Sequence, residues 1–228
     1  MFKYFALIPA AMADIAAMER QVDASSIDPR AFGGSFGNAV RNLNEYGCWC
    51  YMLPGEYHRG KGQPQDDYDK ICKILNEGYE CAVLDSEYEG TTCVPWEVEY
   101  TSAFGGSTMT LAEECLQHNP GNMCAVRACV VEGNFAVEFI ELLLSGNGFY
   151  DSLWHSKSFD PKAQCGGHSG QHGQGSRPEK ACCGSYPNRS AYNTQGGDRK
   201  CCGNMTYNSL VRTCCDAESS NIKAVCDD

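Results

Sequence analysis

The most regular alternation of apolar and polar positions in this chain lies between residues 124 and 145. Apolar side chains recur there at steps of three and four residues, as on one face of an amphipathic helix. The positions are Ala128, Val131, Phe135, Phe139 and Leu142. The glycine-containing run 145–148 follows and favours a helix end. The pattern therefore predicts a long helix that begins near Cys124.

Two further helices are predicted upstream. The spacing of Phe36, Val40 and Leu43 suits a short amphipathic helix. A second helix is expected to start near Asp66, whose carboxylate can accept hydrogen bonds from free amide groups, and to end at Gly78.

The segments around these helices carry weaker signals. Glycine and proline recur within residues 51–65, so this segment is expected to form a loop. Residues 82–110 are expected to be irregular, with possible short strands around 83–84 and 98–101. These patterns together predict a mainly α fold.

Sixteen cysteines indicate a disulfide framework formed in an oxidising compartment, because no CxxC pair suggests a zinc or redox site. Residues 1–13 read as a signal peptide, although an apolar N-terminal helix is the alternative, and residues 14–34 as a lead-in segment. No other stretch is long and apolar enough to predict a transmembrane segment. We therefore expect a secreted, extracellular protein, soluble or bound to a matrix.

A formal net charge of -11 disfavours binding to nucleic acid or to anionic lipid surfaces, because like charges repel. It weakly favours cationic partners, including calcium held loosely at the acidic surface. The alternative is that the acidity only keeps the protein soluble. We expect no cofactor and no defined metal site.

The amino-acid composition changes near residue 165. Residues 166–178 form a Gly/His-rich linker, and residues 179–228 carry adjacent cysteines in a tandem pattern. The pairs are Cys182 and Cys183, Cys201 and Cys202, and Cys214 and Cys215. This small module has too few apolar residues for a hydrophobic core, so we expect an irregular structure constrained by disulfides. Neighbouring cysteines bond each other only with strain, so each pair is expected to bond to adjacent turns; a metallothionein-like cluster is the rival.

The motifs before residue 145 resemble the core of secreted phospholipases A2. The sequence Tyr-Gly-Cys-Trp-Cys at 46–50 and the run at 60–69 match this family closely, in the correct order and with mostly correct spacing. The resemblance covers roughly residues 36–145 and implies a phospholipase A2-like domain over residues 35–165. It also implies two antiparallel, disulfide-linked helices.

The same resemblance implies that catalysis has been lost. Leu75 stands where the family has its histidine, Asn76 where it has its calcium-binding aspartate, and Glu132 where an aspartate orients the histidine. A leucine has no lone pair with which to accept a proton from water, and an asparagine lacks the charge of the calcium ligand. The chain's five histidines, which lie outside these two helices, are His58, His118, His155, His168 and His172.

The cysteines missing from the family pattern are missing in pairs. The resemblance implies that Ile71 and Glu138 replace one bonded pair, and that Gly78 and Val131 replace another. The family-type bridges that it implies are Cys50 to Cys72, Cys93 to Cys124 and Cys115 to Cys129.

The tail resembles the dicysteine repeats of galaxin, a family of extracellular skeletal-matrix proteins. Two sequons, at Asn188 and Asn204, predict glycosylation on exposed loops of a secreted chain. Otoconin, a matrix protein of calcium mineral, likewise looks like a phospholipase scaffold used structurally. We therefore expect a non-catalytic, disulfide-rich matrix component that contacts other matrix proteins or its own copies. The alternatives are a module that holds a lipid or protein ligand in the vestigial acyl channel and, remotely, an active phospholipase A2.

Overall fold

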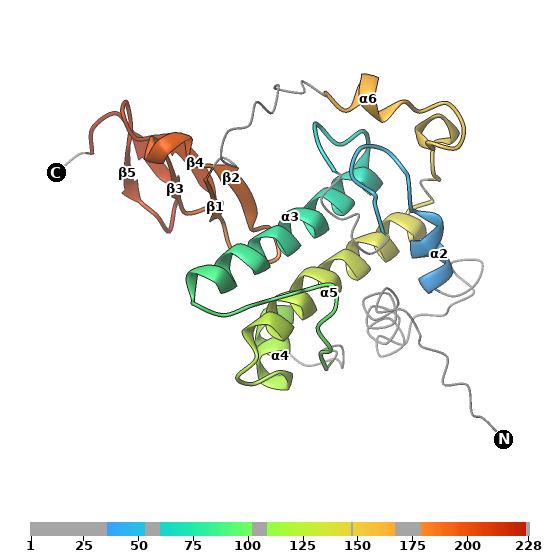
Figure 1. Ribbon diagram of the computed structural model, residues 1–228, viewed down its shortest axis with the longest axis horizontal. Coiled ribbons are helices and arrows are strands. Elements are labelled where there is room, and N and C mark those ends of the chain that lie inside the picture. The colour runs from blue at the N-terminus through green and yellow to red at the C-terminus, as the bar shows by residue number, and fades with distance from the viewer. Residues whose placement is uncertain (1–35, 53–59, 102–108, 147, 167–178, 227–228) are drawn as a thin grey trace.

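The computed structural model describes residues 36–52, 60–101, 109–146, 148–166 and 179–226 (Figure 1). The expected signal peptide, the lead-in segment and nearly all of the linker lie outside these residues. The remainder combines a helical part with a C-terminal module of β-hairpins.

Two 22-residue helices, α3 (Asp67–Tyr88) and α5 (Met123–Leu144), form the centre of the helical part. They lie side by side and run in opposite directions (Figure 1). The short helix α2 (Phe36–Asn42) packs at the end where α3 begins and α5 finishes. The core between them is made of apolar and aromatic side chains that are almost wholly buried: Phe36, Val40, Leu43, Tyr46, Leu75, Tyr79, Val131, Phe135 and Phe139.

Helix α3 starts as expected, because the carboxylate of Asp66 accepts a hydrogen bond from the backbone N–H of Asp69. The predicted end at Gly78 is wrong. A Cβ at Gly78 would lie 2.8 Å from both γ-carbons of Val131 on α5, so glycine is required here for close helix packing and not for a turn. The helix continues through residues 83–84, where a strand was expected.

The additional turns of α3 are tied to α5 by the buried side chain of Arg127. Its Nη1 donates to Ser86 Oγ at 2.9 Å, and its Nη2 pairs with the carboxylate of Glu89. Burying a guanidinium is costly, and these two hydrogen bonds offset part of that cost. This polar clamp holds the end of α3 against the beginning of α5.

A helix that the sequence analysis did not predict, α4 (Leu111–His118), packs beside α5. Its start is fixed by a capping box, in which Thr110 and Glu113 exchange hydrogen bonds between their side chains and backbone amides. The strand expected at 98–101 is absent from those four residues, which carry no regular secondary structure. Two short helical turns complete this part, η3 (Asp151–Leu153) and α6 (Pro161–Gln164).

The C-terminal module consists of three antiparallel hairpins and not of the irregular structure that was expected. They are β1 (Lys180–Cys183) with β2 (Ser190–Asn193), β3 (Arg199–Cys202) with β4 (Met205–Asn208), and β5 (Thr213–Asp216) with β6 (Asn221–Lys223); η4 (Gln195–Gly197) joins the first two hairpins. The fold is therefore a mixture of helices and hairpins, which "mainly α" describes only in part.

All sixteen cysteines form disulfides. In the helical part the bonds are Cys48–Cys165, Cys50–Cys72, Cys93–Cys124 and Cys115–Cys129. The last three are the pairs that the phospholipase resemblance implied. None of the eight bonds joins α3 directly to α5, so the expected disulfide link between these helices is replaced by side-chain packing.

Candidate functional site

Glu132 occupies the centre of the helical part and is wholly buried. Tyr79 donates its hydroxyl hydrogen to Glu132 Oε1 at 2.8 Å, and Tyr100 donates to Oε2 at 2.5 Å. Hydrogen bonds to a carboxylate are stronger than those between neutral groups, which compensates part of the cost of burying it. Both carboxylate oxygens are thus engaged by side chains of the protein and closed off from solvent.

Leu75 and Asn76 lie on α3, in the same part of the core. Leu75 is wholly buried among apolar side chains. The Asn76 amide group donates to the backbone oxygens of Cys72 at 2.8 Å and Trp49 at 3.1 Å. Its Oδ1 atom is buried and has no hydrogen-bond partner within the described ranges. A leucine side chain cannot accept a proton, and an asparagine amide carries no charge with which to hold calcium as a carboxylate does.

Asp69 holds the segment at 46–50 against the first turn of α3. Its buried carboxylate accepts backbone hydrogen bonds from Cys48 at 2.8 Å, Trp49 at 2.6 Å and Gln65 at 2.9 Å. Burial raises the pKa of this carboxyl group, and the amides oppose that shift only partly. Gly47 faces the same carboxylate so closely that a Cβ there would lie 2.4 Å from the Asp69 Cγ atom. Asp69 is an organiser of the loop, a role the sequence analysis did not assign to it.

Two of the five histidines belong to the described residues. His155 places Nε2 2.6 Å from the backbone oxygen of Gly47 and stacks on Phe159. His118 is exposed at the end of α4. Over the described part of the chain, no group of three or more His, Cys, Asp or Glu side chains is arranged to hold a metal ion. His58, His168 and His172 lie outside it.

The hairpin module is docked on the outward face of α3. Arg189 donates from Nε and Nη2 to the two carboxylate oxygens of Asp85, at 2.8 and 2.9 Å, and the Tyr186 hydroxyl donates to the same carboxylate at 2.9 Å. Burial and the Asp85 charge raise the pKa of Tyr186, so its hydroxyl remains a donor. A second ion pair joins Lys180 to Glu80.

The adjacent cysteines of this module form a continuous ladder. In each pair the first cysteine bonds backward along the chain and the second bonds forward: the bonds are Cys81–Cys182, Cys183–Cys201, Cys202–Cys214 and Cys215–Cys226. Successive side chains of a strand point to opposite faces, so a Cys-Cys dipeptide can link the units on either side of it. The first bond anchors the ladder on α3, the second and third connect successive hairpins, and the last ties β5 to the segment that follows β6.

The two sequons occupy exposed positions in the module. Asn188 lies in the β1–β2 connection and Asn204 in the β3–β4 turn, and both side chains are exposed. A large polar glycan can be accommodated at such positions without disturbing a core.

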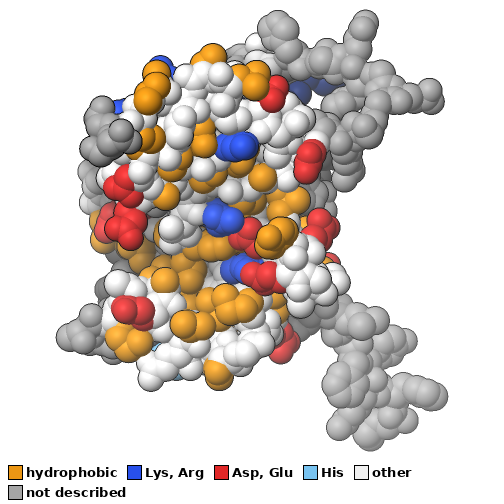
Figure 2. All heavy atoms as spheres, turned by 90° about the vertical axis from the view of Figure 1, so that its left-hand side faces the viewer, with side chains coloured by type: hydrophobic (Ala, Val, Ile, Leu, Met, Phe, Trp, Pro, Cys, Tyr) orange, Lys and Arg blue, Asp and Glu red, His pale blue; other side chains and the backbone are white. Residues whose placement is uncertain are grey.

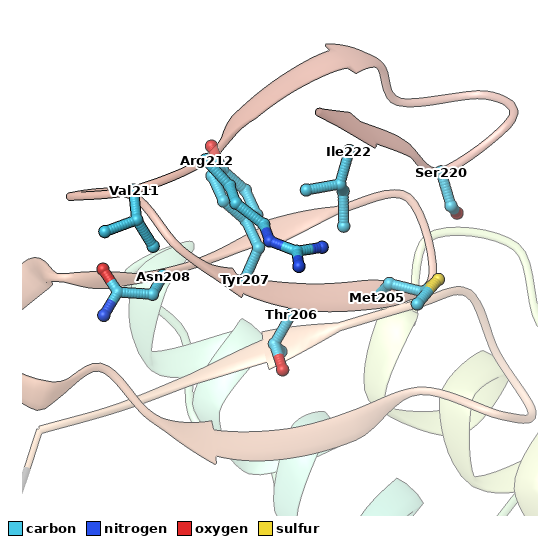
Figure 3. Close-up of a pocket in the computed structure, with 8 residues that line it drawn as sticks. All are labelled: Met205, Thr206, Tyr207, Asn208, Val211, Arg212, Ser220 and Ile222. Atoms are coloured by element: carbon cyan, nitrogen blue, oxygen red, sulfur yellow. The ribbon is translucent and has the colours of Figure 1, made fainter. Parts of the chain in front are cut away.

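The surface of the described residues includes two open grooves. One, of about 490 Å³, lies where α3 begins and α5 ends and is bordered by Asp67, Ile71, Glu138 and Leu142. The other, of about 360 Å³, lies in the hairpin module between β4 and β6 (Figure 3).

No protein-family model and no curated protein matches this chain. Among the described helices, none combines the length and the apolar character needed to cross a bilayer.

Proposed function

We propose that the chain is a secreted, catalytically inert relative of the phospholipases A2 that serves as a structural component of an extracellular matrix. The observation that carries the proposal is the closed environment of Glu132, which is wholly buried and whose two oxygens accept hydrogen bonds from Tyr79 and Tyr100. Hydrolysis requires a base that can take a proton from water, and this carboxylate is sealed away from it.

The positions of the missing cysteines support the resemblance on which the proposal depends. Gly78 packs directly against Val131, and Ile71 borders the same groove as Glu138. Both pairs of substituted positions therefore face each other across α3 and α5. Such proximity is what the loss of two cross-helix disulfides from a common scaffold would leave behind.

The disulfide ladder supports the structural half of the proposal. The module buries only a few side chains, among them Cys183 and Cys202, so its hairpins depend on covalent links rather than on a hydrophobic core. Eight disulfides make the whole chain suited to an oxidising, mechanically demanding setting outside the cell.

The test is fractionation of cells that secrete the full-length chain. We expect the protein in the detergent-insoluble material deposited around the cells, with all eight disulfides formed. Recovery of the chain solely from the culture medium, as a monomer that carries lipid, would contradict the matrix role and favour the ligand-binding alternative.

A further inference from the structure

The last residue of α3 is the most exposed tyrosine in the part of the chain that the structure describes. The side chain of Tyr88 is 94% exposed, and its hydroxyl forms no hydrogen bond with any other described residue. The end of α3 lies on the left-hand side of Figure 1, and this side of the molecule faces the viewer in Figure 2. An enzyme can therefore reach the phenol without opening the core.

Tyr88 also lies within an acidic segment. Glu87 precedes it, Glu89 follows it, and Asp85 stands three positions before it. Residues 83–93 contain no lysine, arginine or histidine, so the segment carries a local charge of three carboxylates without a cation in the sequence around them. The side chains of Glu87 and Glu89 are exposed beside the phenol. The tyrosine hydroxyl is thus offered to solvent in an anionic setting.

An anionic setting favours one class of tyrosine-modifying enzyme. A transferase whose donor is a polyanion holds that donor with lysine and arginine side chains, and the same cations attract acidic segments of a protein substrate. Tyrosine sulfotransferases of the Golgi lumen, which use phosphoadenosine phosphosulfate as the donor, are enzymes of this kind. A secreted chain passes through that compartment after it has folded and formed its disulfides.

The fold selects Tyr88 from several tyrosines that the sequence makes equally acidic. Tyr68 lies between Asp67 and Asp69, and Tyr100 also follows two nearby glutamates. In the folded chain Tyr68 is 3% exposed and Tyr100 is 7% exposed. An enzyme that acts on the folded protein cannot reach either hydroxyl.

Exposure without acidic neighbours is found at Tyr150. This side chain is 63% exposed, and Tyr150 and Tyr88 are the two exposed tyrosines among the described residues. Within five positions of Tyr150 the sequence has a single acidic residue, Asp151, which forms an ion pair with Lys157. Tyr88 is therefore the described tyrosine that combines an accessible hydroxyl with an acidic segment.

We propose that Tyr88 is a sulfation site of the folded chain. The phenol oxygen attacks the sulfur of phosphoadenosine phosphosulfate, and the bond from sulfur to the bridging phosphate oxygen breaks. The phenol proton passes to a base of the transferase, and adenosine bisphosphate leaves with the electron pair of the broken bond. The product is an aryl sulfate whose negative charge strengthens the acidic end of α3. This proposal rests on the proposed function only for secretion.

The direct test incubates the purified, oxidised full-length chain with a tyrosine sulfotransferase and phosphoadenosine phosphosulfate that carries radioactive sulfur. We expect the native chain to take up label, and Tyr88→Phe to lose it while retaining its disulfides, because the missing hydroxyl is exposed. Glu87→Gln should lower the rate of labelling severalfold, because it removes an exposed charge beside the phenol. No label on the native chain, or a label that persists in Tyr88→Phe, overturns the proposal.

Tyr150→Phe is the matched control, because it removes the other exposed tyrosine, and it should keep the label. The reduced and alkylated chain provides a second comparison. Unfolding exposes Tyr68 and Tyr100, so this chain should take up more label than the oxidised one. Equal labelling of the two forms at the same tyrosines would show that the fold makes no selection and would contradict the proposal.

The chain recovered from secreting cells shows whether the ester forms on the secretory route. After removal of N-glycans, the native chain should carry one SO₃ group that Tyr88→Phe lacks and that alkaline phosphatase does not remove. A group that phosphatase removes is a phosphate, which contradicts sulfation. A chain sulfated at Tyr88 but found solely in the medium contradicts the matrix role and supports this proposal, whereas a chain in the deposited matrix with an unmodified Tyr88 contradicts this proposal alone.

Discussion

Arg189 on the hairpin module donates two hydrogen bonds to the carboxylate of Asp85 on α3, 104 positions away in the sequence. The guanidinium fork matches the two carboxylate oxygens, a geometry that lysine cannot reproduce. Together with the Cys81–Cys182 disulfide, this pair fixes the module to the helical part at two points. The module is therefore a docked extension of the helical scaffold and not a loosely tethered tail.

The docking predicts unequal effects of two mutations at the same interface. Arg189→Ala should lower the free energy of unfolding by about 1–3 kcal/mol, because it removes charge-assisted hydrogen bonds from a pair that is 26% and 18% exposed. Lys180→Ala, whose ion pair with Glu80 is 44% and 33% exposed, should cost no more than about 1 kcal/mol. Chemical denaturation of the oxidised proteins measures both. Equal losses would contradict the assignment of Arg189 as the main polar anchor.

The buried carboxylate predicts a structural penalty when either tyrosine loses its hydroxyl. Tyr79→Phe and Tyr100→Phe should each destabilise the fold by about 1–3 kcal/mol, because each takes a hydrogen-bond donor away from a buried carboxyl oxygen. Denaturation with urea gives the free energies. Since both hydroxyls bind the same carboxylate, the double variant should lose an amount different from the sum of the two. Wild-type stability in both single variants would mean that Glu132 does not need these donors.

Asp69 predicts a pH dependence of stability with a definite sign. Its pKa in the folded protein is raised above the ordinary value of 3.8, so the folded state binds the proton more tightly than the unfolded state. The contribution of this group to stability should therefore increase as pH falls through its folded pKa and level off below 3.8. The measurement is the unfolding free energy of the wild type minus that of Asp69→Asn, taken from pH 7 to pH 3.5. We expect this quantity to rise as the pH falls. A quantity that falls on acidification would show that the three amides outweigh burial.

The ladder predicts that its bonds differ in importance with position. Replacing both Cys81 and Cys182 by serine removes a disulfide between residues 101 positions apart in the sequence. Replacing Cys202 and Cys214 removes a disulfide between residues only 12 positions apart. In the loop-entropy description the costs are about 4–5 and about 3 kcal/mol respectively. Hydrogen exchange should show the first variant opening the β1–β2 hairpin, and the second affecting only the two later hairpins. Uniform exchange in the module of both variants would contradict a sequential ladder.

Several features of the fold follow from local sequence, and others depend on contacts that no local pattern contains. Asp66 indicated the start of α3 because capping is decided within one turn. Gly78 misled the prediction of its end, because the reason for glycine there is Val131 on another helix. The capping box of Thr110 and Glu113 was a readable signal for α4 that was overlooked.

The hairpin module also combines features that local sequence indicates with features that depend on distant contacts. The glycines that follow two of the cysteine pairs, Gly184 and Gly203, adopt positive φ values of 93° and 59°, which suits them to the turns between strands. With the cysteine pairs, they could have indicated hairpins. The partners of Cys48 and Cys81 could not be chosen from sequence, because a bond across about a hundred residues depends on how the whole chain folds.

The measurement that tests the central claim most directly is calcium-dependent release of fatty acid from phospholipid micelles by the purified, oxidised chain. In the proposed function Leu75 and Asn76 stand in place of a base and a metal ligand, and Glu132 is closed off by two tyrosines. We therefore predict no release above the protein-free rate between pH 6 and pH 9, with or without calcium. Release that requires calcium and follows the protein through purification would contradict the account.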